Sequence, residues 1–221
     1  PEWETVGAQM TDDVTAFENM KLSLLNASHT LLSYPSFLGG YRKVDAAMHN
    51  ERIKKFVRAF MDEDITPYVP APADTDLEEY KQTLVERFGN RMVSDQVARL
   101  CFDGASKFPV YVMPNLKKMT ADDADGKRVE LKRVAYLFAA YRHYLKYKTD
   151  DNGEAFEVAD PWLTAADWKL IESDNAADFL GVSAFTSTDL KAAPHFAGLY
   201  EKMVSEIKER GAIKVLEEEI L

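Results

Sequence analysis

The amino-acid sequence predicts an all-α fold, and three observations support that prediction. Apolar residues recur at helical spacing through most of the 221 residues. Residues that start and stop helices bracket most of these periodic segments. Alternating strand patterns are missing apart from short ambiguous runs such as Val110–Met113. The chain is therefore expected to bury its apolar residues between helices.

The first half of the chain should hold several helices. The first long helix is expected over Asp13–Leu32, where Thr15 and Glu18 could form a capping box. Turn residues follow at Ser33–Ser36 and at Gly39–Gly40. The next segments are a helix or helix pair over Tyr41–His49 and Glu51–Asp64, a proline-stiffened connector over Pro67–Pro72, and a helix over Leu77–Phe88 that Asp76 caps and Gly89 ends.

The second half continues in the same way. Pro114 should limit or kink one of its helices. An acidic loop is expected at Ala121–Gly126 and a turn at Asp150–Gly153. The predicted helices are Ser94–Phe102, Pro109–Met119, Arg128–Lys148, Trp162–Glu172, Pro194–Arg210 and Ala212–Glu219.

Composition excludes several classes of protein. The formal net charge of −10 argues against nucleic acid as a partner, because such proteins need a basic face. No apolar run has the ~18 residues of a membrane helix, so no membrane partner is expected. The single cysteine, Cys101, excludes an internal disulfide framework and fits a reducing compartment. The expected location is the cytoplasm.

Glycine-rich phosphate loops are also missing. Neither the G-x-G-x-x-G pattern nor the G-x-x-x-x-G-K pattern occurs in the sequence. Any nucleotide cofactor must therefore be bound by a segment other than this one.

The predicted first helix carries an unusual polar set. On a regular helix, with Lys21 at zero, Glu18 falls near 60°, His29 near 80° and Asn26 near 140°. The remainder of the helix is almost entirely apolar, which is typical of a buried helix. We therefore expect the four polar groups to line a cleft rather than to face bulk water.

Burial would suit these groups to catalysis. Desolvation disfavours the ammonium form of a lysine, and a neutral lysine can accept a proton. An asparagine amide and an imidazole can donate hydrogen bonds to an oxygen that gains negative charge. This set suits interconversion of a secondary alcohol and a ketone. A purely structural interpretation stays open, in which Lys21 reaches solvent, Glu18 pairs with it and His29 packs in the core.

Several motifs resemble one enzyme family. The K-x4-N-x2-H pattern of Lys21, Asn26 and His29 is similar to the catalytic motif of the polyol-specific long-chain dehydrogenases. Further similar stretches follow in the expected order over about residues 5 to 116: Leu38–Tyr41, Met61–Pro67, Arg87–Asn90 and Ala98–Pro109. Beyond Leu116 the resemblance rests mainly on helical character and length. The family includes mannitol 2-dehydrogenase, arabinitol dehydrogenase, and fructuronate and tagaturonate reductases.

The resemblance implies a role for each of these residues. Lys21 would be the general base, Asn26 would help to form the oxyanion site and His29 would orient the substrate. Glu18 is a possible proton relay. Arg99 and Lys107 would contact substrate hydroxyls. From the residues alone, Arg99 could instead pair with Asp103 four positions later, and Lys107 could be a solvated loop charge.

The resemblance also implies a second domain. Family members carry an N-terminal Rossmann-like domain that binds NAD or NADP, and this sequence holds no such segment. Residues 1–12 would then be the remnant of an interdomain linker, and 13–221 an all-helical catalytic and substrate-binding domain that is inactive alone. No metal is expected, because lysine and asparagine replace zinc. Two alternatives remain: a hexuronate reductase of the fructuronate or tagaturonate type, and a non-catalytic all-α interaction module.

Overall fold

The computed structural model describes residues 2–6 and 10–221, and within them the protein is helical. The described part of the chain contains no β-strand, only two isolated bridges that join Lys43 to Gln96 and Thr149 to Ala155. The all-α prediction is therefore confirmed. Part of the expected linker, residues 1 and 7–9, lies outside the described residues. Within the remainder of that segment, Trp3–Val6 forms an exposed 3₁₀ turn, η1.

The first long helix runs without a break from Val14 to Leu38, in three pieces. These are α1 (Val14–Met20), a π-helical turn η2 (Lys21–Asn26) and α2 (Ala27–Leu38). Its N-cap is Asp13, whose carboxylate accepts a hydrogen bond from the Ala16 N–H at 3.0 Å. The capping box expected from Thr15 and Glu18 was therefore wrong.

The predicted turn at Ser33–Ser36 was also wrong, because α2 continues through Pro35. A proline inside a helix removes one backbone hydrogen bond and normally breaks the helix. Here nearly every residue of α2 is buried, including Ser33, Tyr34 and Ser36 at 0% exposure. Tertiary packing therefore overrides the local preference. Gly39 and Gly40 do end the helix, as predicted.

The remaining helices of the first half follow the prediction: the helix over Leu77–Phe88 has the predicted bounds, and the others are shorter or divided. They are α3 (Val44–Met48), α4 (Glu51–Ala59), η3 (a π turn, Phe60–Ile65), η4 (a 3₁₀ turn, Thr66–Tyr68), α5 (Leu77–Phe88), α6 (Val97–Cys101) and α7 (Gly104–Lys107). The N-caps Asn50 and Asp76 both accept backbone hydrogen bonds from the first turn of their helices.

The second half begins with another π turn, η5 (Phe108–Val112), followed by α8 (Met113–Ala124). The ambiguous run Val110–Met113 is thus helical, and the expected acidic loop begins only after Ala124. The later elements are α9 (Lys132–Tyr147), α10 (Ala165–Glu172), η6 (Ala176–Gly181), η7 (Ser183–Phe185), η8 (Leu190–Ala192), α11 (Pro194–Arg210), α12 (Ala212–Val215) and η9 (Leu216–Ile220).

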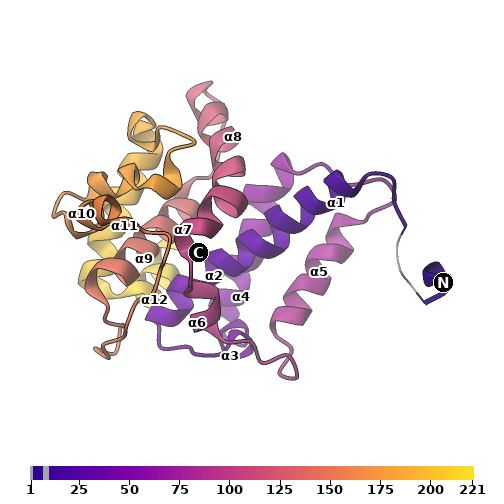
Figure 1. Cartoon of the computed structure of the whole chain (residues 1–221), viewed down its shortest axis with the longest axis horizontal. Helices are drawn as coiled ribbons and strands as arrows, with labels where there is room; N and C mark the ends of the chain where they lie inside the picture. The colour runs from indigo at the N-terminus through magenta and orange to yellow at the C-terminus, as the bar shows by residue number, and fades with distance from the viewer. Residues whose placement is uncertain (1, 7–9) are drawn as a thin grey trace.

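Helices α2 and α9 form the centre of the molecule (Figure 1). Helix α9 packs against both α2 and α11, and its Tyr136, Phe138 and Tyr141 side chains are fully buried. In Figure 1, α1, α4 and α5 extend to the right of this centre, and α10, α11 and α12 lie to the left. The first long helix therefore runs from the periphery at its start into the core at its end.

A buried ion pair ties the first half of the chain to α9. The Arg133 guanidinium donates to both carboxylate oxygens of Asp64, at 2.6 and 2.8 Å, and to Glu63 at 2.7 Å. Asp64 is only 1% exposed and belongs to η3, which packs against η2. The pair therefore fastens the element that supports the π turn of the first helix.

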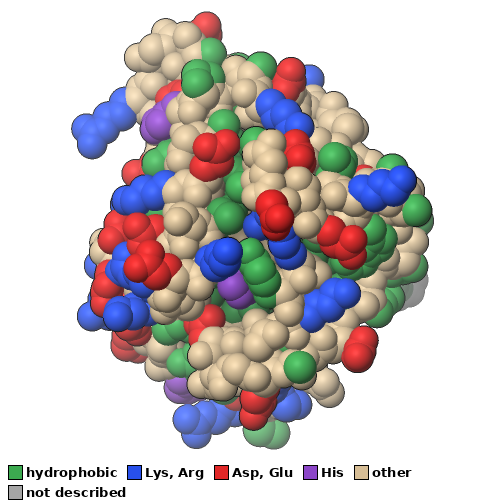
Figure 2. Space-filling model, turned by 90° about the vertical axis from the view of Figure 1, so that its left-hand side faces the viewer, with side chains coloured by type: hydrophobic (Ala, Val, Ile, Leu, Met, Phe, Trp, Pro, Cys, Tyr) green, Lys and Arg blue, Asp and Glu red, His purple; other side chains and the backbone are tan. Residues whose placement is uncertain are grey.

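The surface gives two further observations. On the face formed by the C-terminal helices, acidic and basic side chains of the described residues are interspersed rather than gathered by sign (Figure 2). None of the described helices combines the length and apolar character needed to cross a membrane.

Candidate active site

An open cleft of about 310 Å³ lies beside η2 and the start of α2. Its wall also includes parts of α6, α7 and η5, which follow about eighty residues later in the chain. The lining residues are Lys21, Leu25, Asn26, His29, Thr30, Arg99, Leu100, Lys107 and Tyr111. All five residues predicted to act in catalysis or substrate binding thus border one cleft.

The π turn changes how Lys21 and Asn26 are arranged. In a regular α-helix, residues five apart are separated by about 140° around the axis. In a π turn the hydrogen bonds close after five residues, so such residues lie above one another on the same side. Lys21 and Asn26 are the first and last residues of η2. The separation expected for a regular helix is therefore too large for these two residues.

Asn26 lines the cleft and carries an unpaired, buried polar atom. Its side-chain Oδ1 is buried and has no hydrogen-bond partner among the described residues. A buried polar atom without a partner is costly, and such atoms often mark functional positions. A carboxamide can both donate and accept, so a hydroxyl or an oxyanion in the cleft could pair with this side chain.

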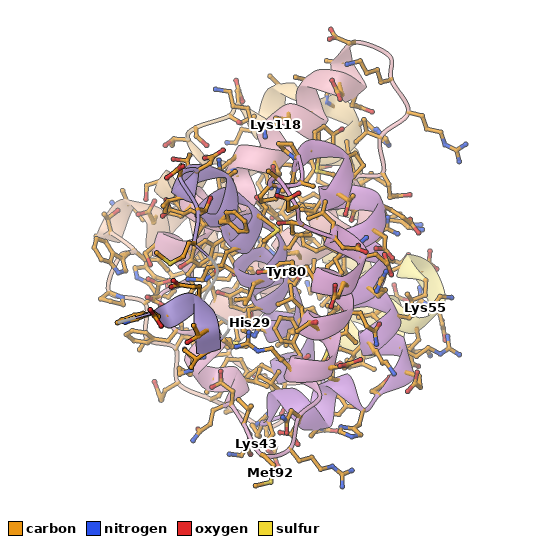
Figure 3. The ribbon with its side chains drawn as sticks, turned by 90° about the vertical axis from the view of Figure 1, so that its right-hand side faces the viewer. His29, Lys43, Lys55, Tyr80, Met92 and Lys118 are labelled. Atoms are coloured by element: carbon orange, nitrogen blue, oxygen red, sulfur yellow. The ribbon has the colours of Figure 1, made fainter. Side chains whose placement is uncertain are left out.

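His29 is half-buried and stacks on an aromatic ring. Its ring centroid lies 4.2 Å from that of Phe88 on α5, at an interplanar angle of 27°. Burial lowers the pKa of His29 to about 4, although the nearby Asp95 carboxylate opposes the shift. The imidazole is therefore neutral near pH 7, with one donor nitrogen and one acceptor nitrogen. Figure 3 shows His29 near the middle of its face of the molecule.

A smaller hollow of about 190 Å³ adjoins the cleft, and His29 lines both. Val44, Phe88, Val93 and Asp95 contribute to its walls. Met92, which precedes Val93, lies at the lower edge of the same face in Figure 3. The imidazole thus lines both cavities, and a group bound in either one could contact it.

Lys21 borders the cleft but its side chain is exposed, and Glu18 is exposed and does not line the cleft. The expectation that Lys21 is desolvated is therefore wrong for this chain alone. The buried stripe of the helix passes through Met20, Leu24 and Ala27. This stripe leaves Glu18 and Lys21 on the outer side.

Arg99 forms a bidentate ion pair with Asp95, which lies just before the start of α6. Its Nε donates to Asp95 Oδ1 at 2.8 Å, and a terminal nitrogen donates to Oδ2. The hydrogen bond from Arg99 lowers the pKa of Asp95, against the effect of burial. The partner considered from the sequence, Asp103, was wrong. The Arg99 side chain stays 64% exposed, so it can still reach a ligand.

Lys107 is held by the end of α6 rather than solvated in a loop, so that alternative was wrong. Its Nζ donates to the carbonyl oxygens of Leu100 at 3.0 Å and Phe102 at 2.6 Å, and pairs with Asp103 at 2.7 Å. Its side chain is 19% exposed. Asp103 has a left-handed backbone with φ of 56°, which lets the chain turn between α6 and α7.

Sequence reasoning missed Asp95, Asp103 and Phe88 as members of this site. The spacing of four between Asp95 and Arg99, and between Asp103 and Lys107, is the spacing of helical ion pairs and could have indicated both. The stacking of Phe88 on His29 depends on tertiary packing, which no local spacing reveals.

Comparison with known proteins identifies the family. The family model for the mannitol dehydrogenase C-terminal domain matches residues 13–208, so the match extends well past Leu116, where the motif resemblance stopped. Mannitol 2-dehydrogenase of Aspergillus fumigatus is 34% identical over 220 residues, which are 98% of this chain and 43% of that protein. This chain thus spans less than half the length of the curated relatives that it matches.

Two solved structures resemble the fold. A ternary complex of Pseudomonas fluorescens mannitol 2-dehydrogenase with NAD and D-mannitol has a TM-score of 0.87 and 38% identity, over 98% of this chain and 43% of that one. A substrate-free D-sorbitol dehydrogenase has a TM-score of 0.86 and 29% identity, over 96% of this chain and 43% of that one. The helical fold, the residues matched and these likenesses agree, and the chain belongs to the mannitol dehydrogenase C-terminal domain family.

Proposed function

We propose that this chain is the substrate-binding and catalytic domain of an NAD(P)-dependent polyol dehydrogenase that interconverts a mannitol-like sugar alcohol and a fructose-like ketose. One observation carries the proposal. Three separate stretches of the chain bring Lys21, Asn26, His29, Arg99 and Lys107 to the wall of one cleft. The names of the relatives, mannitol and sorbitol dehydrogenases, support the substrate class.

Neutral Lys21 accepts the proton of the reacting secondary hydroxyl while hydride leaves the same carbon, so the alcohol becomes a ketone and the lysine an ammonium. Asn26 lines the cleft, and its side-chain Nδ2 donates a hydrogen bond to the oxygen as it gains negative charge. His29 is neutral and donates to or accepts from a neighbouring hydroxyl. In the reverse direction, the Lys21 ammonium returns the proton.

The described residues do not fit the cofactor. They hold no β-strand, and the sequence has no glycine-rich phosphate loop. We assign NAD(P) binding to the Rossmann-like part of such enzymes, and residues 1–12 to the linker towards it. A bound nicotinamide supplies the hydride acceptor, and the residues of this chain handle the proton and the hydroxyls. Cover from that part would also supply the desolvation of Lys21 that this chain lacks.

We further propose that the chemistry is metal-independent. Within the described residues, no three His, Cys, Asp or Glu side chains are grouped to hold a metal ion. Lys21 and Asn26 take the place of a Lewis-acid metal here: Lys21 accepts the proton and Asn26 stabilises the oxygen that gains negative charge.

Steady-state kinetics test the proposal. The full-length gene product should oxidise D-mannitol with NAD or NADP, and residues 1–221 alone should not. Asn26→Ala should lower kcat by roughly 10²-fold, the scale of removing one oxyanion donor. Turnover by the purified 1–221 chain contradicts the assignment of cofactor binding to another part of the enzyme. Full activity of Asn26→Ala contradicts the role proposed for Asn26 in the cleft.

A further inference from the structure

The two cations that project towards the cleft from α6 and α7 are already paired. Arg99 binds Asp95 through two hydrogen bonds, and Lys107 pairs with Asp103 and donates to backbone carbonyls. Each pair is made within four residues of the same segment. This part of the cleft therefore carries little net charge, although its sequence looks basic.

Charge pairing of this kind decides which ligands fit. A sugar acid has a carboxylate that seeks an unpaired guanidinium or ammonium group. A sugar carboxylate bound to Arg99 here would lie beside the Asp95 carboxylate, and the repulsion between the two negative charges would weaken its binding. A neutral polyol needs only donors and acceptors, and a guanidinium with two N–H groups engaged has three left. The 64% exposed Arg99 side chain can direct these towards a hydroxyl.

The other cations near the cleft do not change this balance. Arg87 lies on α5 and lines the smaller hollow rather than the cleft. Lys21 borders the cleft itself. In the proposed reaction it faces the reacting hydroxyl, so it is not free to hold a carboxylate.

Asp95 is itself fixed in place. Its Oδ1 accepts a hydrogen bond from the Gln96 N–H at 2.8 Å, and its backbone carbonyl accepts one from the Val44 N–H at 3.0 Å. The second bond joins it to the start of α3. Asp95 therefore holds Arg99 from a rigid position rather than following it, as a flexible surface partner would.

We propose that Asp95 is a specificity-determining residue: by neutralising Arg99 it makes the cleft select neutral polyols and reject sugar acids. The inference rests on the proposed function, because it assigns a substrate class to the same cleft. It also separates the polyol dehydrogenase from the hexuronate reductase that the sequence left open. Asp95 acts through Arg99 and is a positioning residue.

Two substrates that differ in one group test the inference. D-Mannonate is D-mannitol with one terminal hydroxymethyl group replaced by a carboxylate. Their kcat/KM values for oxidation should be measured on the full-length protein, as wild type, Asp95→Asn and Asp95→Asn with Arg99→Gln. Glu209→Gln is the matched control, since it removes one negative charge from an exposed position on α11 that does not line the cleft.

Wild type should strongly favour mannitol. Asp95→Asn should raise the mannonate-to-mannitol ratio by roughly tenfold to a hundredfold, the scale of one hydrogen bond to a charged group. The change should appear mainly in the KM for mannonate. Adding Arg99→Gln should abolish the increase, and Glu209→Gln should leave the ratio unchanged. Simple damage to the fold lowers kcat/KM for both substrates together and does not produce this pattern.

Calorimetric titration of the same proteins with the two ligands makes the test independent of turnover. If wild type oxidises neither compound, the proposed function fails, while the ratio of dissociation constants still decides the role of Asp95. A wild-type protein that binds mannonate as tightly as mannitol overturns the inference. The inference is also overturned if the mannonate-to-mannitol ratio of Asp95→Asn equals that of Glu209→Gln.

Discussion

Arg133→Met should destabilise the fold by about 3–5 kcal/mol near neutral pH, the usual effect of removing one partner of a buried ion pair. Arg133 is 6% exposed and Asp64 is 1% exposed, and the two groups share hydrogen bonds of 2.6 and 2.8 Å. Without the guanidinium, the Asp64 carboxylate stays buried and unpaired. This loss is a large fraction of the ~5–15 kcal/mol by which domains are stable.

The destabilisation should depend on pH in a defined direction. Burial raises the pKa of Asp64 to about 6 even with Arg133 beside it, and removal of Arg133 should raise that pKa further. Because the folded variant then holds its proton more tightly than the unfolded chain, its stability is greatest at low pH. That stability falls as the pH rises from the ordinary carboxyl range, ~4, through the raised pKa. The loss relative to wild type should therefore be smaller near pH 5 than near pH 8.

Urea unfolding followed by far-ultraviolet circular dichroism measures both effects. The control is Arg133→Met combined with Asp64→Asn, which removes the buried charge and should recover much of the lost stability. A single variant that loses less than about 1 kcal/mol, or loses the same amount at both pH values, refutes the reasoning. It would mean that Asp64 is hydrated rather than buried.

Two further predictions concern the site and its support. The His29 imidazole should titrate with a pKa of about 4 by NMR, so this group should make the fold less stable as the pH falls from about 6.5 to 4. Phe88→Ala should raise the pKa of His29, because the variant relieves the burial of the ring. A wild-type ring that titrates near pH 6.5 contradicts this prediction. Gly104→Ala should lower the free energy of unfolding by about 1–3 kcal/mol in thermal unfolding, because its Cβ would lie 2.1 Å from the Tyr34 hydroxyl. The control is Gly198→Ala on α11, whose Cβ meets nothing within 4 Å, so this variant should be neutral or stabilising. Equal effects of the two variants would contradict the packing around Gly104.

Local sequence signals predicted the helices well and their irregularities poorly. Asp76 and Gly89 marked α5 correctly, because caps act within a few residues. Pro35 suggested a stop that packing against the core overrides. The π turn over Lys21–Asn26 has no local sequence signature, since its extra residue is accommodated by packing on η3 and η5.

The site followed the same division. The family motifs selected Lys21, Asn26, His29, Arg99 and Lys107, and the fold brings all five to one cleft. The motifs could not predict how exposed each side chain is or what it contacts. The exposure of Lys21 and the stacking of His29 depend on contacts between elements far apart in the chain. Such contacts become visible only once the chain is folded.

Mannitol oxidation by Lys21→Ala across pH is the measurement that tests the central claim most directly. In the full-length protein, loss of the base should lower kcat by on the order of 10²-fold or more and should change the dependence of the rate on pH. An added primary amine should restore part of the activity, and Lys55→Ala, exposed on α4 outside the cleft, should behave as wild type. A Lys21→Ala enzyme with near-normal kcat and an unchanged pH profile would contradict the account.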